Sequence, residues 1–85
     1  MSYQVEFSKR AAKQFKALSL EIQLRLSPKI DALADEPRPS GMVKLTGEKD
    51  LYRIRVGDYR VVYRIEDENL IVLIIKLGHR SDIYR

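Results

Sequence analysis

The stretch Leu51-Tyr-Arg-Ile-Arg-Val-Gly-Asp-Tyr-Arg-Val-Val-Tyr63 decides the fold of this chain. It holds two runs in which apolar and cationic residues largely alternate, the pattern of strands with one buried face, on either side of Gly57-Asp58. Glycine at the first central position of a two-residue loop favours a type II′ hairpin turn. The stretch therefore predicts two antiparallel strands, over residues 51–56 and 59–66, with a register that the turn fixes.

This register sets Arg55 directly opposite Arg60, and Arg53 opposite Val62. Facing cations destabilise a sheet by up to about 1 kcal/mol, so an anion bound between them would relieve the repulsion. The apolar face, expected under the helices, has Tyr52, Ile54, Val56, Tyr59, Val61, Tyr63 and Ile65. The opposite, open face has Arg53, Arg55, Arg60 and Arg64. We interpret it as a surface for a phosphate-bearing ligand; the alternative is a face of ordinary solvated arginines.

Upstream of the hairpin, the chain predicts one strand and two helices. Residues 2–7 alternate as a strand does. Apolar residues then recur at helical spacing over 9–18, and again from a cap at Ser19 to Glu36, just before Pro37. Pro28 lies inside the second helix, where it should remove a backbone hydrogen bond and bend or break the helix.

The remaining segments complete a small sheet. Residues 37–50 contain two prolines and two glycines, which predict a long connection with a short edge strand near 43–45. The apolar run Leu70–Ile75 does not alternate, which indicates a strand buried on both faces. The order βααβββ predicts one two-layer α+β domain over residues 1–85, with the N-terminal strand and a helical hairpin packed on one face of a mainly antiparallel sheet.

Composition points to a polyanionic partner and away from several other classes. Sixteen Lys and Arg against twelve Asp and Glu give a net charge of +4, and nine of the sixteen cations follow Met42. With no cysteine and one histidine, we expect no metal site and no cofactor. The chain has no apolar run of bilayer length and no signal-peptide pattern, so we expect a cytoplasmic protein without membrane contact.

A second polar cluster follows the last predicted strand. Gly78-His79-Arg80-Ser81-Asp82 leads to Ile83-Tyr84-Arg85, which combines cationic and aromatic side chains. An arginine near a tyrosine can hold a phosphate and stack a nucleobase, although a terminal tyrosine more often packs on the core. His79 is a candidate acid or base, against the commoner structural or solvated role of a lone histidine.

Residues 51–63 and the segment Leu77-Gly-His-Arg-Ser-Asp-Ile-Tyr84 resemble the two signature stretches of the RelE/ParE toxin family. The match extends over nearly the whole chain, including Lys44-Leu-Thr-Gly47 in the connection. The resemblance implies a fold like that of small microbial ribonucleases. For the RelE branch it also implies metal-independent cleavage of mRNA in the ribosomal A site, through attack of the RNA 2′-hydroxyl on its own 3′ phosphate.

The resemblance further implies a partner and a set of site residues. The partner is a co-expressed antitoxin that wraps and neutralises the toxin, and the complex would contact operator DNA through the antitoxin. The implied catalytic residues are Arg60 as the transition-state arginine, Arg80, Tyr84 and Arg55. Together with the open face of arginines derived above, the resemblance leads us to expect RNA binding by Arg53, Arg55, Arg64, Lys44 and His79.

One departure and one alternative accompany this resemblance. The best-known enzyme of the branch has lysines where this chain has Arg53 and Arg55, and arginine stays protonated, so the general base stays unassigned among His79, water and ribosomal groups. The alternative is the ParE branch, which inhibits DNA gyrase by binding; a third possibility is a simple nucleic-acid-binding module. Arg80 and Tyr84 together favour the nuclease.

Overall fold

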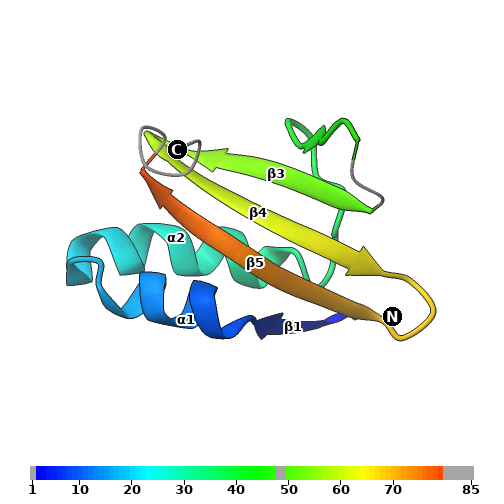
Figure 1. The fold of residues 1–85 in the computed structure, drawn as a ribbon, viewed down its shortest axis with the longest axis horizontal. Helices are drawn as coiled ribbons and strands as arrows, with labels where there is room; N and C mark the ends of the chain where they lie inside the picture. Colours follow the sequence, from blue (N-terminus) through cyan, green and yellow to red (C-terminus); the bar gives the residue numbers. More distant parts are fainter. Residues whose placement is uncertain (1, 48–49, 80–85) are drawn as a thin grey trace.

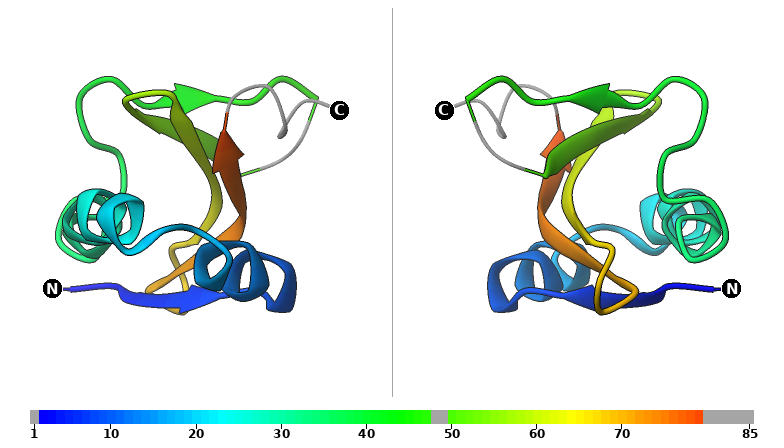
Figure 2. Two further views of the ribbon diagram at one scale, coloured as in Figure 1. Left: turned by 90° about the vertical axis from the view of Figure 1, so that its left-hand side faces the viewer. Right: turned by 90° about the vertical axis from the view of Figure 1, so that its right-hand side faces the viewer.

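The computed structural model describes residues 2–47 and 50–79, which form one five-stranded sheet with two helices. The elements are β1 (Gln4–Phe7), α1 (Lys9–Lys16), α2 (Leu20–Ala32), β2 (Val43–Lys44), β3 (Leu51–Val56), β4 (Tyr59–Glu66) and β5 (Ile71–His79). The strand order is β1-β5-β4-β3-β2, and the curved sheet has α2 on one side (Figures 1 and 2). The predicted α+β class and the mainly antiparallel sheet are confirmed.

The N-terminal strand is where the predicted arrangement is wrong. It belongs to the sheet itself as an edge strand, parallel to β5, instead of packing on the sheet with the helices. The backbone N–H of Gln4 donates to the Leu70 carbonyl at 2.7 Å, and that of Ser8 donates to the Ile74 carbonyl at 2.9 Å. Period-two alternation identifies a strand but not its neighbour, so the sequence pattern did not contain this pairing.

Both helices begin at the serines that the sequence marked as caps. The hydroxyls of Ser8 and Ser19 accept from the third backbone N–H that follows, at 3.0 and 3.4 Å. The helices end earlier than predicted, at Lys16 and Ala32. Pro28 does not break α2: Leu24, whose carbonyl loses its partner there, is exposed, so water can replace the missing N–H donor.

The core lies between the helices and one face of the sheet. Its side chains are between 0% and 7% exposed: Ala11, Leu26, Ile30, Leu33, Tyr52, Ile54, Val61, Tyr63, Ile65, Val72, Ile74 and Leu77. The largest fully buried side chain is Tyr63, and its hydroxyl donates to the Pro37 carbonyl at 2.8 Å. This bond ties the end of the helical layer to the middle of the sheet.

The last strand is longer than its apolar run. The prediction covered Leu70–Ile75, whereas β5 runs from Ile71 to His79, and Leu70 precedes it with a φ of 53°. Burial on both faces is also wrong as a description, because the fully buried positions lie toward the helices and the others are only partly covered. The strand therefore presents residues on both faces, and one of these faces carries the candidate site.

Candidate active site

The hairpin between β3 and β4 builds the site, and its predicted register is confirmed. Arg55 lies opposite Arg60, and Arg53 lies opposite Val62. Within the turn, Gly57 has a φ of 62° and Asp58 has no positive φ, as a type II′ turn requires. A Cβ atom at position 57 would lie 2.8 Å from Nη2 of Arg25, so the Arg25 side chain reaches the turn from α2. Because the end of that side chain can shift, the positive φ is the reason why glycine is needed here.

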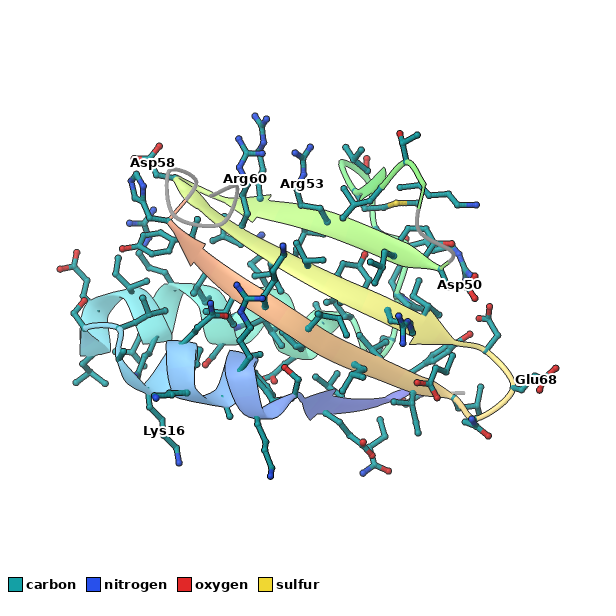
Figure 3. The ribbon with its side chains drawn as sticks, in the orientation of Figure 1. Lys16, Asp50, Arg53, Asp58, Arg60 and Glu68 are labelled. Carbon is teal, nitrogen blue, oxygen red and sulfur yellow. The ribbon has the colours of Figure 1, made fainter. Side chains whose placement is uncertain are left out.

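Cations surround one apolar residue on the face of the sheet that lies away from the helices. Val62 has Arg53 and Lys76 beside it across the ladder, and Arg60 and Arg64 lie two positions before and after it along β4. We call this surface the cationic face: Arg53, Arg55, Arg60, Val62, Arg64 and Lys76. Figure 3 shows Arg53 and Arg60 projecting away from α1 and α2.

The centre of the cationic face is covered, which corrects the expectation of a fully open surface. Arg60 is 8% exposed and Val62 is 2% exposed, whereas Arg55 and Arg64 are exposed. Long arginine and lysine side chains can lay their aliphatic stems over a central valine. A guanidinium so shielded from water interacts more strongly with a nearby phosphate than an exposed one does, because the local dielectric is lower.

Two predicted site residues do not lie on the cationic face. Lys44 pairs with Tyr52, and His79 pairs with Tyr59. Directly opposite residues share a face, so both side chains belong to the helix side of the sheet. The His79 ring meets the Tyr59 ring edge to face, with centroids 5.6 Å apart, because β5 continues through His79 instead of ending before it. Neither residue therefore lies among the arginines of the cationic face, and their predicted roles in RNA binding stay predictions.

Two predicted site residues, Arg80 and Tyr84, lie outside the described residues. One cation of the cationic face, Lys76, was not among the predicted site residues. Lys76 occupies the cationic face opposite Val62. The sequence signal for it was a single lysine inside the apolar run Ile74-Ile-Lys-Leu77, beyond the end of the predicted strand. A charged residue in such a run indicates that the strand continues with one face toward solvent.

A second arginine environment lies at the other end of the sheet. Nη2 of Arg38 lies 2.9 Å from Oδ2 of Asp67, and the Tyr3 hydroxyl donates to Oδ1 of Asp67 at 2.6 Å. The Arg38 guanidinium also stands 5.5 Å from the centre of the Tyr52 ring. Hydrogen bonds from Arg38 and then Tyr3 hold the pKa of Asp67 below its usual value. We call these four residues the Arg38–Asp67 cluster.

Residues 2–47 and 50–79 contain neither a cluster of metal ligands nor a membrane-spanning helix. No group of histidine and carboxylate side chains there is arranged to hold a metal ion. No helix within those ranges is long and apolar enough to cross a bilayer.

Comparison with known proteins identifies the family. The model of the ParE toxin of type II toxin-antitoxin systems, parDE, matches residues 5–84. The chain belongs to this toxin family. A RelE-like toxin protein of Escherichia coli is 39% identical over 99% of this chain and 92% of its own length. The mRNA interferase toxin RelE of E. coli K12 is 33% identical over the same shares.

Solved structures of family members have the same fold. The toxin in the intact E. coli RelBE toxin-antitoxin complex superposes with a TM-score of 0.82 at 31% identity, covering 92% of this chain and 96% of that one. An archaeal RelE–RelB complex from Pyrococcus horikoshii gives 0.82 at 34% identity, covering 96% and 99%. The predicted RelE/ParE resemblance is confirmed, and the neighbouring structures are RelE toxins.

Proposed function

We propose that this RelE-type toxin is an endoribonuclease that cleaves mRNA in the ribosomal A site and thereby inhibits translation. The observation that supports it best is the Arg55–Arg60 pair, set side by side by a tight hairpin on the face opposite the helices, with Arg60 8% exposed. Repulsion within this pair destabilises the sheet, and a phosphodiester bound between the two guanidinium groups would offset that repulsion. The name mRNA interferase, borne by a relative that is 33% identical, agrees with this reading.

In the proposed reaction, the RNA 2′-oxygen attacks the adjacent phosphorus and the 5′-oxygen leaves with a proton. The products are a 2′,3′-cyclic phosphate and a 5′-hydroxyl. The pentacovalent intermediate carries additional negative charge, and fixed cations aimed at that charge lower the barrier. Arg60 and Arg55 supply them, and Arg53 and Arg64 hold the flanking phosphates.

The remaining assignments belong to the same proposal. Arg80 adds charge at the phosphate, and Tyr84 stacks on or orients the reacting nucleotide. The arginines cannot take the proton from the 2′-hydroxyl, because they stay protonated at any relevant pH. The ribosome aligns the message, and alignment supplies a large part of the rate. No metal and no cofactor enters this scheme.

We propose a neutralising antitoxin as the protein partner. Several relatives of known structure are titled as RelB–RelE toxin-antitoxin complexes. For this chain, the antitoxin would cover the cationic face or displace the toxin from the ribosome. Any contact of the complex with operator DNA would be made by the antitoxin. The expected place of action is the cytoplasm, where translating ribosomes are found.

Transcript mapping tests the proposal. Brief expression of the toxin should create new 5′ ends within translated messages, and primer extension detects them. The ends should disappear when ribosomes are stalled before the cleavage site or when the message lacks a start codon. Arg60→Ala should abolish the cuts, whereas the matched variant Arg10→Ala, at an exposed arginine of α1, should retain them. Full cleavage by a folded Arg60→Ala protein would exclude the assigned site.

A second candidate function is gyrase inhibition, because the matching family model is described by the ParE toxin. A gyrase inhibitor binds its target and cuts no RNA. Its expression would therefore produce DNA damage while transcripts stay intact. The same cultures used for primer extension can be examined for double-strand breaks, so one experiment separates the two functions.

A further inference from the structure

A β-bulge in β5 decides which face of the sheet Lys76 occupies. Tyr63 pairs with Ile74, but the next residue of β4, Val62, pairs with Lys76, so β5 contains one extra residue between the two pairs. In a regular strand, positions 74 and 76 share a face, and Lys76 would point into the core beside Ile74. The bulge turns Lys76 to the cationic face and returns Leu77, which is 1% exposed, to the core.

Helix α1 and its cap hold this bulge in place. The Ser8 backbone N–H donates to the Ile74 carbonyl at 2.9 Å, and the Ser8 hydroxyl donates to the Ile75 carbonyl at 2.7 Å. The Leu77 backbone N–H donates to Oε1 of Gln14 at 2.8 Å. A bulge interrupts the strand ladder, so its backbone groups need other partners. Ser8 and Gln14 supply those partners from outside the sheet.

The position of Lys76 suits a second phosphate. Its ladder partner is Val62, and its diagonal neighbour on β4 is Arg60, whose own partner is Gly78. Diagonal neighbours on adjacent strands lie roughly 7–8 Å apart. Because Gly78 has no side chain, nothing from that position stands between Arg60 and Lys76 on this face. The Lys76 side chain is partly exposed, so a ligand on the cationic face can reach it.

We infer that Lys76 binds the RNA phosphate next to the one held by Arg55 and Arg60, and that the bulge fixed by Gln14 puts it there. The inference rests on the proposed RNA-cleaving function. A lysine is a flexible point charge and needs no fixed geometry to hold a non-reacting phosphate, whereas a planar arginine pair suits the reacting one. Lys76 is thus a substrate-binding residue, and Gln14 is a positioning residue.

Binding of a non-cleavable RNA tests the role of Lys76. The probe is a short 2′-O-methyl RNA oligonucleotide, in which the attacking hydroxyl is blocked, and fluorescence anisotropy is recorded at several salt concentrations. Lys76→Met keeps an unbranched side chain of similar length opposite Val62 and removes the charge. It should weaken binding about five- to tenfold and lower the slope of log K against log salt by about 0.7. Lys76→Arg should bind within about twofold of the parent protein.

The control is Lys16→Met, which removes a lysine that points away from the cationic face (Figure 3) and should leave both affinity and salt slope unchanged. Gln14→Leu removes the acceptor for the Leu77 N–H and should weaken binding as much as Lys76→Met does. Because both act through one contact, the double variant should bind no more weakly than either single variant. Thermal melting of each variant confirms that it is folded.

The outcomes separate this inference from the proposed function. If Lys76→Met binds RNA like the parent protein while the parent cleaves translated messages, the role of Lys76 is refuted and the nuclease stands. If Lys76→Met loses affinity but the parent cuts no message, the phosphate contact stands and the nuclease is refuted. A normal Gln14→Leu protein, or losses that add in the double variant, would refute the positioning role of Gln14.

Discussion

The arginines in two regions of this sheet have different neighbours. In the Arg38–Asp67 cluster, the guanidinium lies 2.9 Å from a carboxylate and stands over a tyrosine ring. On the cationic face, the cross-strand neighbour of Arg55 is Arg60, and that of Arg53 is a valine with Lys76 beyond it. The first region connects the N-terminal segment, the turn between β4 and β5, and β3. The second brings several positively charged side chains together on one face of the sheet.

The difference indicates which arginines stabilise the fold and which serve ligand binding. An arginine that serves the fold has an acidic partner, and its charge is neutralised locally. Cations that face one another lower stability, and natural sheets generally avoid such pairs. Their presence on an otherwise well-packed sheet agrees with the proposed binding of RNA phosphates to this face. Substitutions in the two regions should therefore change different measured quantities.

The largest effect is expected at Arg60. Arg60→Leu removes the shielded cation beside the reacting phosphate, and loss of one such preorganised group typically reduces the rate about 100- to 1,000-fold. Cleavage of a translated message in an extract measures it. Because the substitution also ends the repulsion with Arg55, the free energy of unfolding should stay level or rise. Full cleavage activity of the variant, or a loss of both activity and stability, would contradict the assignment of Arg60 to cleavage instead of to the stability of the fold.

A charge reversal at Arg55 sharpens the comparison further. Arg55→Glu gives Arg60 an opposite charge across the ladder, and such a pair contributes roughly 0.2–1 kcal/mol. The midpoint of thermal unfolding should rise by a few degrees, while RNA binding is lost. Arg64→Glu is the matched control, because Arg64 lies directly opposite Leu51 and Leu73, so the same change of charge creates no directly opposing ion pair. Equal melting shifts in both variants would contradict repulsion at the Arg55–Arg60 pair.

Tyr63 tests the stability side of the comparison. Its buried hydroxyl donates to the Pro37 carbonyl at 2.8 Å, and burial raises the pKa of Tyr63 to about 12. Tyr63→Phe leaves that carbonyl without its donor and should lower the free energy of unfolding by about 1 kcal/mol in urea denaturation. Cleavage activity should be unchanged, because the side chain points to the core and not to the cationic face. A loss of activity without a loss of stability would refute this assignment.

The sequence predicted the parts of the site that depend on local rules. The Gly57-Asp58 turn and the alternation on both sides of it fix the hairpin register, so the Arg55–Arg60 pair followed directly. The faces of Lys44 and His79 did not follow from the sequence, because they depend on which residue of another strand each one meets, and their RNA-binding roles stay predictions. Lys76 was missed because the bulge that turns it outward is held by Gln14, which lies 63 residues from Leu77 in the chain. The roles of Arg80 and Tyr84 stay predictions.

The smallest effect is expected at Asp67, where the contribution to stability depends on pH, unlike that of the cationic face. Hydrogen bonds from Arg38 and Tyr3 lower the pKa of this carboxylate in the folded state, so its contribution to stability is complete above the pKa of the unfolded chain. It is lost as the pH falls through the lower, folded-state pKa. Asp67→Asn should therefore melt slightly earlier than the parent protein at neutral pH, and the gap should close in acid. Arginines stay charged throughout this range, so the cationic face adds nothing to the slope. A gap that persists at low pH would mean that Asp67 acts through packing and not through its charge.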